Sequence, residues 1–456
     1  MFPYSRRAFL RTTASGFGYV AFAGLSTLAA ERAANPLAPK TPHFKPKARR
    51  VIFLCMEGGP SHVDTFDHKP RLARDDGKPI GRGRVPSAKL LQSPWKFSRH
   101  GQSGLWISEL FPEVAKRADE LCLLHGMHTD IPNHPQAFQQ MHTGLFQFRR
   151  PSLGAWVLYG LGTENDRLPG FVTISPPSQN GGPANYGSAF LPAIYQGTRI
   201  GSNGRPVKDA VVSNLKNPRA TPAAQRAQLD LVQAMNRAAL ERDRVNPGVE
   251  GVIESYELAF RMQGELPDVL NLDKESAATR QLYGVGEEGT DNFARQCLMA
   301  RRLVEAGVRF VEVCHGGWDQ HRRLKEDHAR NARAVDQPAA ALLADLKARG
   351  LLNDTVVIWG GEFGRTPYAQ LGDGRDHNNK GYTVWMAGGG VKGGLSYGRT
   401  DDHGYEAVEG KVHVHDWHAT ILHLLGFDHE RLTYRHAGRD FRLTDVKGQV
   451  VKGVLA

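Results

Sequence analysis

Short, almost wholly apolar runs alternate with amphipathic stretches along most of this chain. Such runs are typical of strands covered on both faces, because a strand with one face in water alternates apolar and polar residues. The stretches Ala223–Arg242 and Ala329–Lys347 instead carry apolar residues at helical spacing. Strands that alternate with helices favour an α/β fold with a mainly parallel sheet. The runs that we predict as strands are Val51–Cys55, Leu121–Leu124, Phe171–Ile174, Val308–Val313, Thr355–Trp359 and Thr383–Ala387.

Composition and charge narrow the class of protein. With 40% hydrophobic and 23% charged residues, the 456-residue chain lies in the globular range and is long enough to bury a core without disulfides. Its formal net charge of +11 suits an anionic partner, but the lysines and arginines are spread along the chain rather than gathered into a basic arm. We therefore expect no nucleic-acid partner. Two uses of the positive charge remain. It attracts anionic esters or wall polymers, or it only keeps the protein soluble.

The four cysteines, Cys55, Cys122, Cys297 and Cys314, are far apart and form no CxxC pair. This spacing supports neither a zinc knuckle nor a redox motif. Three of them lie inside apolar runs, where a cysteine usually behaves as a small hydrophobic residue. We expect buried free thiols, and a disulfide is the alternative in an exported protein.

The amino-terminal residues have the features of a targeting segment. Ser5–Arg11 contains paired arginines followed by Phe-Leu, and the weakly apolar, glycine-containing run Ala14–Ala30 comes next. This is the twin-arginine pattern, and the run is too short and too glycine-rich for a stable membrane span, although an uncleaved anchor is the alternative. We predict a signal peptide over residues 1–34 and export to the periplasm or the extracellular space. The remaining residues, 35–456, are predicted to form one domain with a mostly helical insertion at about residues 175–279.

Polar residues that suit metal binding follow four of the predicted strands. Ligands of open α/β sheets bind beyond the carboxyl ends of the strands, so these residues are expected at one edge of the sheet. Imidazoles combined with carboxylates suit zinc or manganese, whereas carboxylate-rich sites suit magnesium or calcium. We predict one or two divalent ions at this edge. The predicted ligands are Asp64, Asp319, His321, Glu362, Asp376, His377 and His415.

Several of these residues have a purely structural alternative. Asp64 suits a turn near the preceding glycines, and Asp319 and His321 flank an evident turn. Glu362 follows an apolar run, where a carboxylate is costly to desolvate unless it meets a cation. Arg365 is then either the salt-bridge partner of Glu362 or a clamp for an oxyanion.

A further pattern lies near the carboxyl end of the chain. In Val412–Asp416 the residues His413 and His415 alternate, so a strand would place both side chains on one face. Asp416 is then well placed to cap a helix that we predict over Trp417–Leu425.

Five sequence motifs stand out together. They are Gly58-Gly59-Pro60-Ser61-x-x-Asp64-Thr65-Phe66-Asp67, His315-Gly-Gly-Trp-Asp319-Gln-His321, Gly361-Glu362-Phe363-Gly364-Arg365-Thr366-Pro367, Gly374-Arg375-Asp376-His377 and His413-Val-His415-Asp416-x-His418. In combination they resemble the secreted bacterial family called domain of unknown function 1501. That family is placed among the alkaline-phosphatase-like proteins and is often labelled sulfatase. The resemblance covers nearly the whole mature chain.

The resemblance implies both a fold and an activity. The fold is an alkaline-phosphatase-like three-layer sandwich with a mainly parallel central sheet. The activity is metal-dependent hydrolysis of sulfate or phosphate esters, with an anionic ester such as a sulfated or phosphorylated glycan as substrate, and the oligomeric state stays open. Two ions bound in this way would stabilise the attacking and the leaving group. In superfamily order the similar positions are Asp64 or Glu57, Asp319 with His321, Glu362 with His377, and His415.

The chain departs from the superfamily at the nucleophile. Sulfatases carry Cys or Ser at the position that Asn133 occupies here. The options are Ser61 or Thr129 as a displaced nucleophile, or direct attack by water activated at a metal, with His134 as general acid or base. We take Ser61, His134 and Arg365 as the catalytic candidates. The alternative is a non-catalytic binding or scaffold protein of the cell envelope that keeps the fold.

Overall fold

The computed structural model describes residues 35–210, 220–243 and 247–456. The predicted signal peptide, residues 1–34, lies outside the described residues. Within the described ranges, no helix has the length and apolar character needed to cross a membrane.

A nine-stranded sheet forms the centre of the fold. Its order is β12-β4-β11-β8-β1-β7-β5-β6, and β15 also pairs with β4. Neighbouring strands run parallel except at β11, which is antiparallel to both β4 and β8. The predicted α/β fold with a mainly parallel sheet is confirmed, and all six predicted strands belong to it. The strands are β1 (Arg50–Met56), β4 (Leu121–His128), β5 (Phe171–Ile174), β6 (Thr198–Ile200), β7 (Phe310–His315), β8 (Thr355–Gly360), β11 (Tyr382–Ala387), β12 (Leu395–Tyr397) and β15 (Val412–His413).

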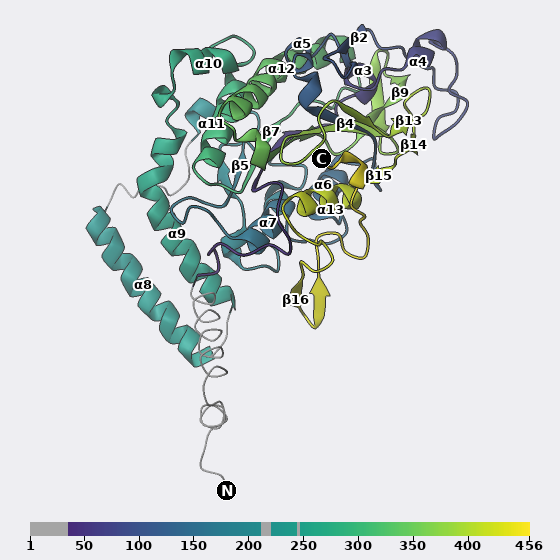
Figure 1. Ribbon diagram of the computed structural model, residues 1–456. Helices are drawn as coiled ribbons and strands as arrows, with labels where there is room; N and C mark the ends of the chain where they lie inside the picture. Colours follow the sequence, from purple (N-terminus) through teal and green to yellow (C-terminus); the bar gives the residue numbers. More distant parts are fainter. Residues whose placement is uncertain (1–34, 211–219, 244–246) are drawn as a thin grey trace.

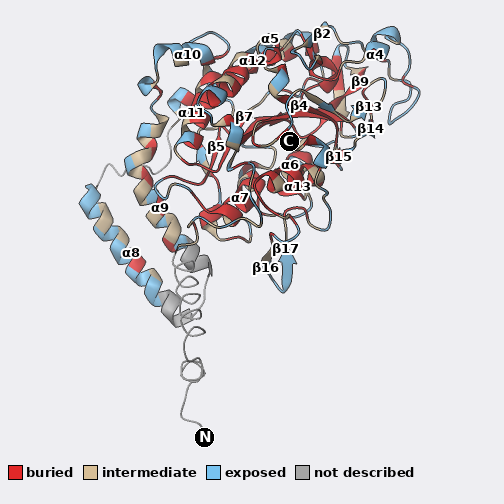
Figure 2. Ribbon diagram, in the orientation of Figure 1, coloured by how far each residue is buried: buried red, intermediate tan, exposed pale blue. Residues whose placement is uncertain are grey.

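Helices cover both faces of this sheet. Figure 1 shows α5, α11 and α12 on one side of it and α6, α7 and α13 on the other. On the second side, Phe53 of β1 packs edge to face against Trp417 of α13, with ring centroids 5.6 Å apart. Six of the seven residues of β1 are buried as a result, which explains why the strand is apolar; Figure 2 shows the buried core. The helices are α5 (Pro112–Ala115), α6 (His134–Thr143), α7 (Leu153–Leu161), α10 (Ala277–Tyr283), α11 (Asp291–Glu305), α12 (Leu324–Ala348) and α13 (Val414–Leu424).

Helix α13 begins earlier than predicted, and its cap differs. His413 is the N-cap residue and accepts a hydrogen bond from the backbone N–H of His415, while the Asp416 side chain accepts from the backbone N–H of His413. The prediction that Asp416 itself is the N-cap is therefore wrong, because Asp416 occupies the third helical position of a capping box. The predicted strand is also wrong for His415, which lies in the first turn of the helix, although the two imidazole rings still stack at 4.7 Å.

Two long helices lie within the segment predicted as a helical insertion. These are α8 (Pro222–Asp243), close to the predicted Ala223–Arg242, and α9 (Pro247–Leu270), which packs against α8. Figure 1 shows α8 projecting from the body of the molecule. The same segment also contains β6, which pairs with β5 at one edge of the central sheet. Residues 175–279 therefore contribute to the sheet as well as to the projecting helices.

Short helices and four two-stranded sheets complete the fold. The short helices α3 (His62–Thr65) and α4 (Pro70–Arg74) follow β1. The four cysteines are buried and free, as predicted. Two-stranded sheets are formed by β2 (Phe97–His100) with β3 (Leu105–Ser108), β9 (Gly364–Gln370) with β10 (Gly374–Asn378), β13 (Arg399–Thr400) with β14 (Ala407–Glu409), and β16 (Tyr434–His436) with β17 (Arg439–Phe441).

Candidate metal centre

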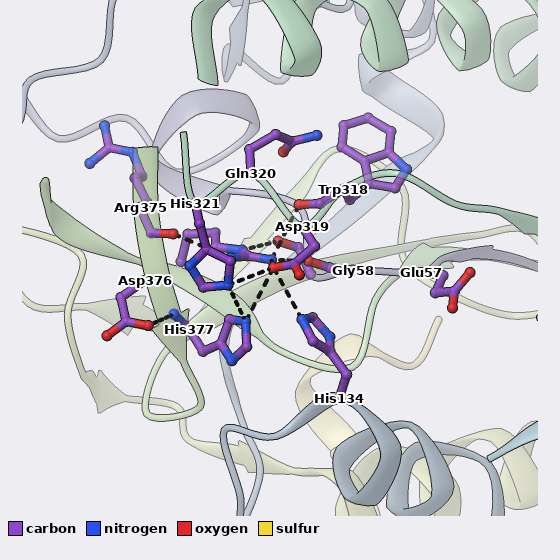
Figure 3. Close-up of polar contacts among 12 residues, drawn as sticks. Glu57, Gly58, His134, Trp318, Asp319, Gln320, His321, Arg375, Asp376 and His377 are labelled. Carbon is purple, nitrogen blue, oxygen red and sulfur yellow. Dashed lines mark hydrogen bonds and ion pairs between the residues drawn. The ribbon is translucent and has the colours of Figure 1, made fainter. Parts of the chain in front are cut away.

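Four side chains from three parts of the chain meet beyond the carboxyl ends of the central strands. His134 is the first residue of α6, Asp319 and His321 lie in the loop after β7, and His377 lies on β10. Their candidate ligand atoms all lie within 4.8 Å of one another. Figure 3 shows the three imidazole rings directed toward the Asp319 carboxylate. We call these four residues the histidine–aspartate cluster.

The cluster converges on a single carboxylate oxygen. Oδ1 of Asp319 lies 3.1 Å from Nε2 of His134, 2.9 Å from Nε2 of His321 and 3.2 Å from Nε2 of His377. The Nε2 atoms of His321 and His377 are themselves 2.9 Å apart. Ligand atoms around a tetrahedral zinc ion lie about 3.3 Å from one another. The spacing in the cluster is close to that value.

The other ring nitrogen of each histidine has a partner outside the cluster. Nδ1 of His134 is 2.5 Å from Oε1 of Glu362, Nδ1 of His377 is 2.9 Å from the carbonyl oxygen of Pro132, and Nδ1 of His321 contacts Oε1 of Gln370. All three partners are acceptors, so Nδ1 carries the proton and Nε2 presents a lone pair. Two Nε2 lone pairs 2.9 Å apart repel unless a cation or a proton lies between them. Metal-ligating histidines are oriented in this way by their outer hydrogen bonds.

Arg365 fixes the position of Asp319. Its guanidinium is fully buried and donates to Oδ1 of Asp319 at 2.6 Å, to the carbonyl oxygen of Gly59 at 3.0 Å and to that of Trp318 at 3.3 Å. Burial raises the pKa of Asp319, but the bonds from His134 and His377 and the charge of Arg365 outweigh it and hold that pKa well below its usual range. Asp319 is therefore ionised. Arg365 pairs with Asp319 rather than with Glu362.

Glu362 lies behind His134 and outside the cluster. Its side chain is fully buried and accepts the backbone N–H of Gly58 at 3.0 Å and 3.2 Å. Gly58 has φ +113°, and a Cβ there would lie 2.6 Å from the backbone nitrogen of Asp319, so the close approach of the two loops requires glycine. Burial lowers the pKa of His134, but its bonds to Asp319 and Glu362 outweigh that effect and raise the pKa to about 9. In the absence of a metal, His134 is thus an imidazolium that bridges the two carboxylates.

Besides Glu362, three of the predicted ligands do not join the cluster. Asp64 forms a fully buried ion pair with Arg375, at 2.6 Å from Nε and 3.1 Å from Nη2, and also accepts from Ser61. The Asp376 carboxylate turns away from the cluster in Figure 3 and accepts the backbone N–H of His377 at 2.9 Å. His415 lies in α13, where its Nε2 is 2.7 Å from the carbonyl oxygen of Gly144.

The catalytic candidates occupy different positions from those expected. His134 is itself a member of the cluster, and Arg365 contacts the cluster through Asp319. Ser61 is fully buried, and its hydroxyl donates to Asp64 at 2.5 Å. Thr129 is buried and donates to Gln140 at 2.8 Å. Neither hydroxyl is among the residues that the structure brings to the cluster.

Sequence reasoning assigned His134 to proton transfer rather than to metal binding, and it gave little weight to Glu57. A signal for His134 was present, because it lies in the segment that follows the predicted strand Leu121–Leu124, where the strand-end rule places ligand residues. Glu57 follows β1 and accepts from Asn180 at 2.6 Å and from Asn203 at 2.5 Å. Burial raises the pKa of Glu57, although both amides act in the opposite direction. In Figure 3 its carboxylate points away from Asp319.

Comparison with known proteins identifies the family. The family described as "Protein of unknown function (DUF1501)" matches residues 48–455, and the chain belongs to it. No curated protein matches the chain. Among solved structures, the chain is similar to Ps i-CgsB, with 10% identity over 84% of this chain and 72% of that one and a TM-score of 0.37.

Two further solved structures have the same TM-score. The lipoteichoic acid synthase LtaP from Listeria monocytogenes is 10% identical over 93% of this chain and 81% of that one, with a TM-score of 0.37. The PsFucS1 sulfatase from Pseudoalteromonas sp. is 14% identical over 96% of this chain and 75% of that one, with a TM-score of 0.37. These likenesses are distant.

Proposed function

We propose that this protein is a metal-dependent hydrolase of anionic esters, sulfate or phosphate, whose metal ion is held by His134, Asp319, His321 and His377. One observation carries the proposal. Three imidazole Nε2 atoms and a carboxylate oxygen converge while the opposite nitrogen of every ring is occupied by an acceptor. A salt-bridge network alone needs no such matched orientation of three rings.

The donor set fits a transition-metal ion. Three imidazoles and one carboxylate favour zinc or manganese over calcium and magnesium, which prefer oxygen ligands. Nε2 of His134 is buried. It lies 3.1 Å from Oδ1 of Asp319 but takes part in no well-formed hydrogen bond. An ion bound here would act as a Lewis acid that polarises an ester oxygen and offsets the negative charge that develops on it.

The cluster is open enough for a substrate to reach. The Asp319 side chain is 45% exposed and that of His321 is 29% exposed. Structural zinc sites are closed, whereas catalytic sites keep a position for water or substrate. The exposure of Asp319 therefore favours a catalytic site over a purely structural one.

The surrounding residues position the cluster rather than react. Glu362 holds the ring of His134, and Arg365 holds Asp319 through a guanidinium that is fully buried. We therefore assign Arg365 to positioning and not to an oxyanion clamp. Because Ser61 is buried against Asp64, we assign the attack to water rather than to a displaced serine.

The substrate class and the location follow from charge and sequence. A net charge of +11 attracts anionic esters, and a sulfated or phosphorylated glycan of the cell envelope fits both that charge and an exported enzyme. Export is supported by the twin-arginine pattern within residues 1–34.

The test combines metal analysis with turnover. We would purify the exported, folded protein, measure bound metal by elemental analysis, and assay aryl sulfates and aryl phosphates. Asp319→Asn and His377→Ala should lose both metal and turnover, whereas His436→Gln, at an exposed histidine of β16, should lose neither. Wild-type protein that binds no metal and turns over neither substrate class refutes the proposal. Metal without turnover favours the binding or scaffold alternative, as does the engagement of the Ser61 and Thr129 hydroxyls with Asp64 and Gln140.

A further inference from the structure

A cavity lies apart from the histidine–aspartate cluster. It is formed where the segment after α3, the β2–β3 hairpin, β4 and the edge strand β12 come together, and its volume is about 350 Å³. The elements α3, β2, β4 and β13 lie in the same part of the molecule (Figure 1). None of the four cluster residues lines it. Small-molecule pockets span about 300–1,000 Å³, so this cavity suits a ligand of one ring.

One wall of the cavity is aromatic. The rings of His68 and Trp106 lie 4.3 Å apart, and Phe97 stacks on His68 at 5.0 Å. Trp106 remains 37% exposed, although it is one of the largest apolar side chains of the protein. The guanidinium of Arg99 lies 5.3 Å from the centroid of the Trp106 ring, and the part of the ring that stays exposed lines the cavity. An exposed aromatic surface beside a cavity is suited to a ligand that has an apolar face and a polar rim.

The floor of the cavity is polar and already ordered. Asp67 is buried and receives Nζ of Lys69 at 2.9 Å and the Thr400 hydroxyl at 2.5 Å. Nδ1 of His125 is 3.2 Å from the Thr383 hydroxyl and 3.7 Å from Asp67. These contacts fix Asp67, Lys69 and His125 before any ligand binds, so little side-chain entropy remains to be lost.

The charges around the cavity are largely balanced. Lys69 is paired with Asp67, and Arg399 at the rim is 3.4 Å from Glu409. Burial lowers the pKa of both His68 and His125, so both rings are neutral near pH 7. The cavity thus offers hydrogen-bond donors and acceptors with little unpaired charge. A ligand with hydroxyl groups fits it better than a bare inorganic anion does.

We propose that this cavity binds a single sugar ring, with one face of the pyranose against Trp106 and His68 and its hydroxyl groups on Asp67, Lys69 and His125. The aromatic wall supplies contact area, and the polar floor supplies orientation. The inference does not depend on the metal centre. The two sites are nevertheless linked in sequence, because the segment from Gly58 to Lys69 supplies backbone contacts to Glu362 and Arg365 at one end and the cavity floor at the other. A glycan held by one of its rings would be retained beside the protein while other parts of it reach the cluster.

The test is calorimetric titration of the full, folded chain with glucose, galactose and N-acetylglucosamine, each at millimolar concentration, and with inorganic sulfate. We expect at least one sugar to bind with a millimolar Kd. Trp106→Ala should weaken that binding by about tenfold, which corresponds to about 1.4 kcal/mol for the lost aromatic contact. Phe148→Ala, which removes another aromatic ring that is 66% exposed, should bind as the wild type does. Asp319→Asn should also bind the sugar normally, which separates this site from the metal centre.

A second variant covers the case in which Trp106→Ala fails to fold. Ser396→Phe places a ring in the cavity from the exposed edge strand β12, where little else has to move, and should abolish sugar binding. Three outcomes overturn the proposal: no sugar binds, the sugar binds equally to the cavity variants and the wild type, or sulfate binds while the sugars do not.

Discussion

The substitution Glu362→Gln tests most directly whether Glu362 orients the ring of His134 for metal binding. The Glu362 carboxylate is fully buried and receives both Nδ1 of His134 at 2.5 Å and the backbone N–H of Gly58 at 3.0 Å. Glutamine offers one acceptor oxygen in place of two and adds an amide donor. If its oxygen accepts from His134, its NH₂ group faces the Gly58 N–H, and two donors meet in a buried site.

The expected effect on metal affinity follows from that loss. Removing an outer partner of a metal-ligating histidine typically weakens metal binding by about 10–100-fold. This corresponds to about 1.4–2.7 kcal/mol of binding free energy. We expect Glu362→Gln to fall in this range, because His134 keeps a hydrogen bond but loses the ionised acceptor that fixes its ring.

The assay is zinc binding in competition with a chromophoric chelator. Glu57→Gln is the matched control, since Glu57 is also a carboxylate beside this loop but accepts from Asn180 and Asn203 rather than from a cluster histidine. The control should bind zinc as the wild type does. A folded Glu362→Gln protein with wild-type zinc affinity would show that Glu362 does not orient His134, and the reasoning would fail.

Three further outcomes can be measured. Asp64→Asn leaves the fully buried Arg375 unpaired and should lower the free energy of unfolding in urea by about 3–5 kcal/mol, far more than Arg71→Ala in an exposed ion pair; equal losses would contradict this. Burial raises the pKa of Asp336 to about 6, so its stabilising contribution is complete below its unfolded pKa of about 4 and is lost as the pH rises through 6. The stability of Asp336→Asn relative to wild type should therefore rise by about 2 kcal/mol between pH 4 and pH 7, and a constant difference would refute the assignment. Zinc at about 100 times its Kd should stabilise the wild type by about 2.7 kcal/mol but His377→Ala far less, and equal stabilisation would place the ion elsewhere.

The fold was predictable because the central strands are buried on both faces. Runs such as Thr355–Trp359 and Thr383–Ala387 are apolar without alternation, and each became a strand within one residue of its predicted bounds. Strand direction was less evident. β11 is antiparallel to both neighbours, although it is as fully buried and as free of alternation as β8, which runs parallel to β1.

The candidate site was predictable only where neighbouring loops determine it. Asp319 and His321 share one loop, and His377 lies on the hairpin after β8, so the strand-end rule brings them together. Asp64 obeys the same rule but pairs with Arg375, a partner that is 311 residues away along the chain. Such a pairing depends on how the whole chain packs, so it cannot be predicted from the residues near Asp64.

His134 was predicted to transfer protons, but the structure places it in the cluster. Its position next to Asn133 suggested a role beside a missing nucleophile, whereas its ring is held by Glu362, 228 residues away. His415 was expected on a strand, but the capping box that starts α13 at His413 turns the chain into a helix and directs its Nε2 to Gly144. The deciding contact is long-range for His134, whereas for His415 it is a local capping box that the sequence pattern did not reveal.

The guanidinium of Arg365 has a consequence for how this site tolerates sequence change. Apart from Asp319, its partners are the carbonyl oxygens of Gly58, Gly59, Trp318 and Arg375, which every amino acid possesses. The arginine therefore ties three separate loops together without reading the identity of their side chains. Apart from Asp319 and the two glycines that the close approach of the loops requires, residues of those loops can change while the loops keep their spacing. Lysine, with one compact ammonium, has no way to span the same set of oxygens.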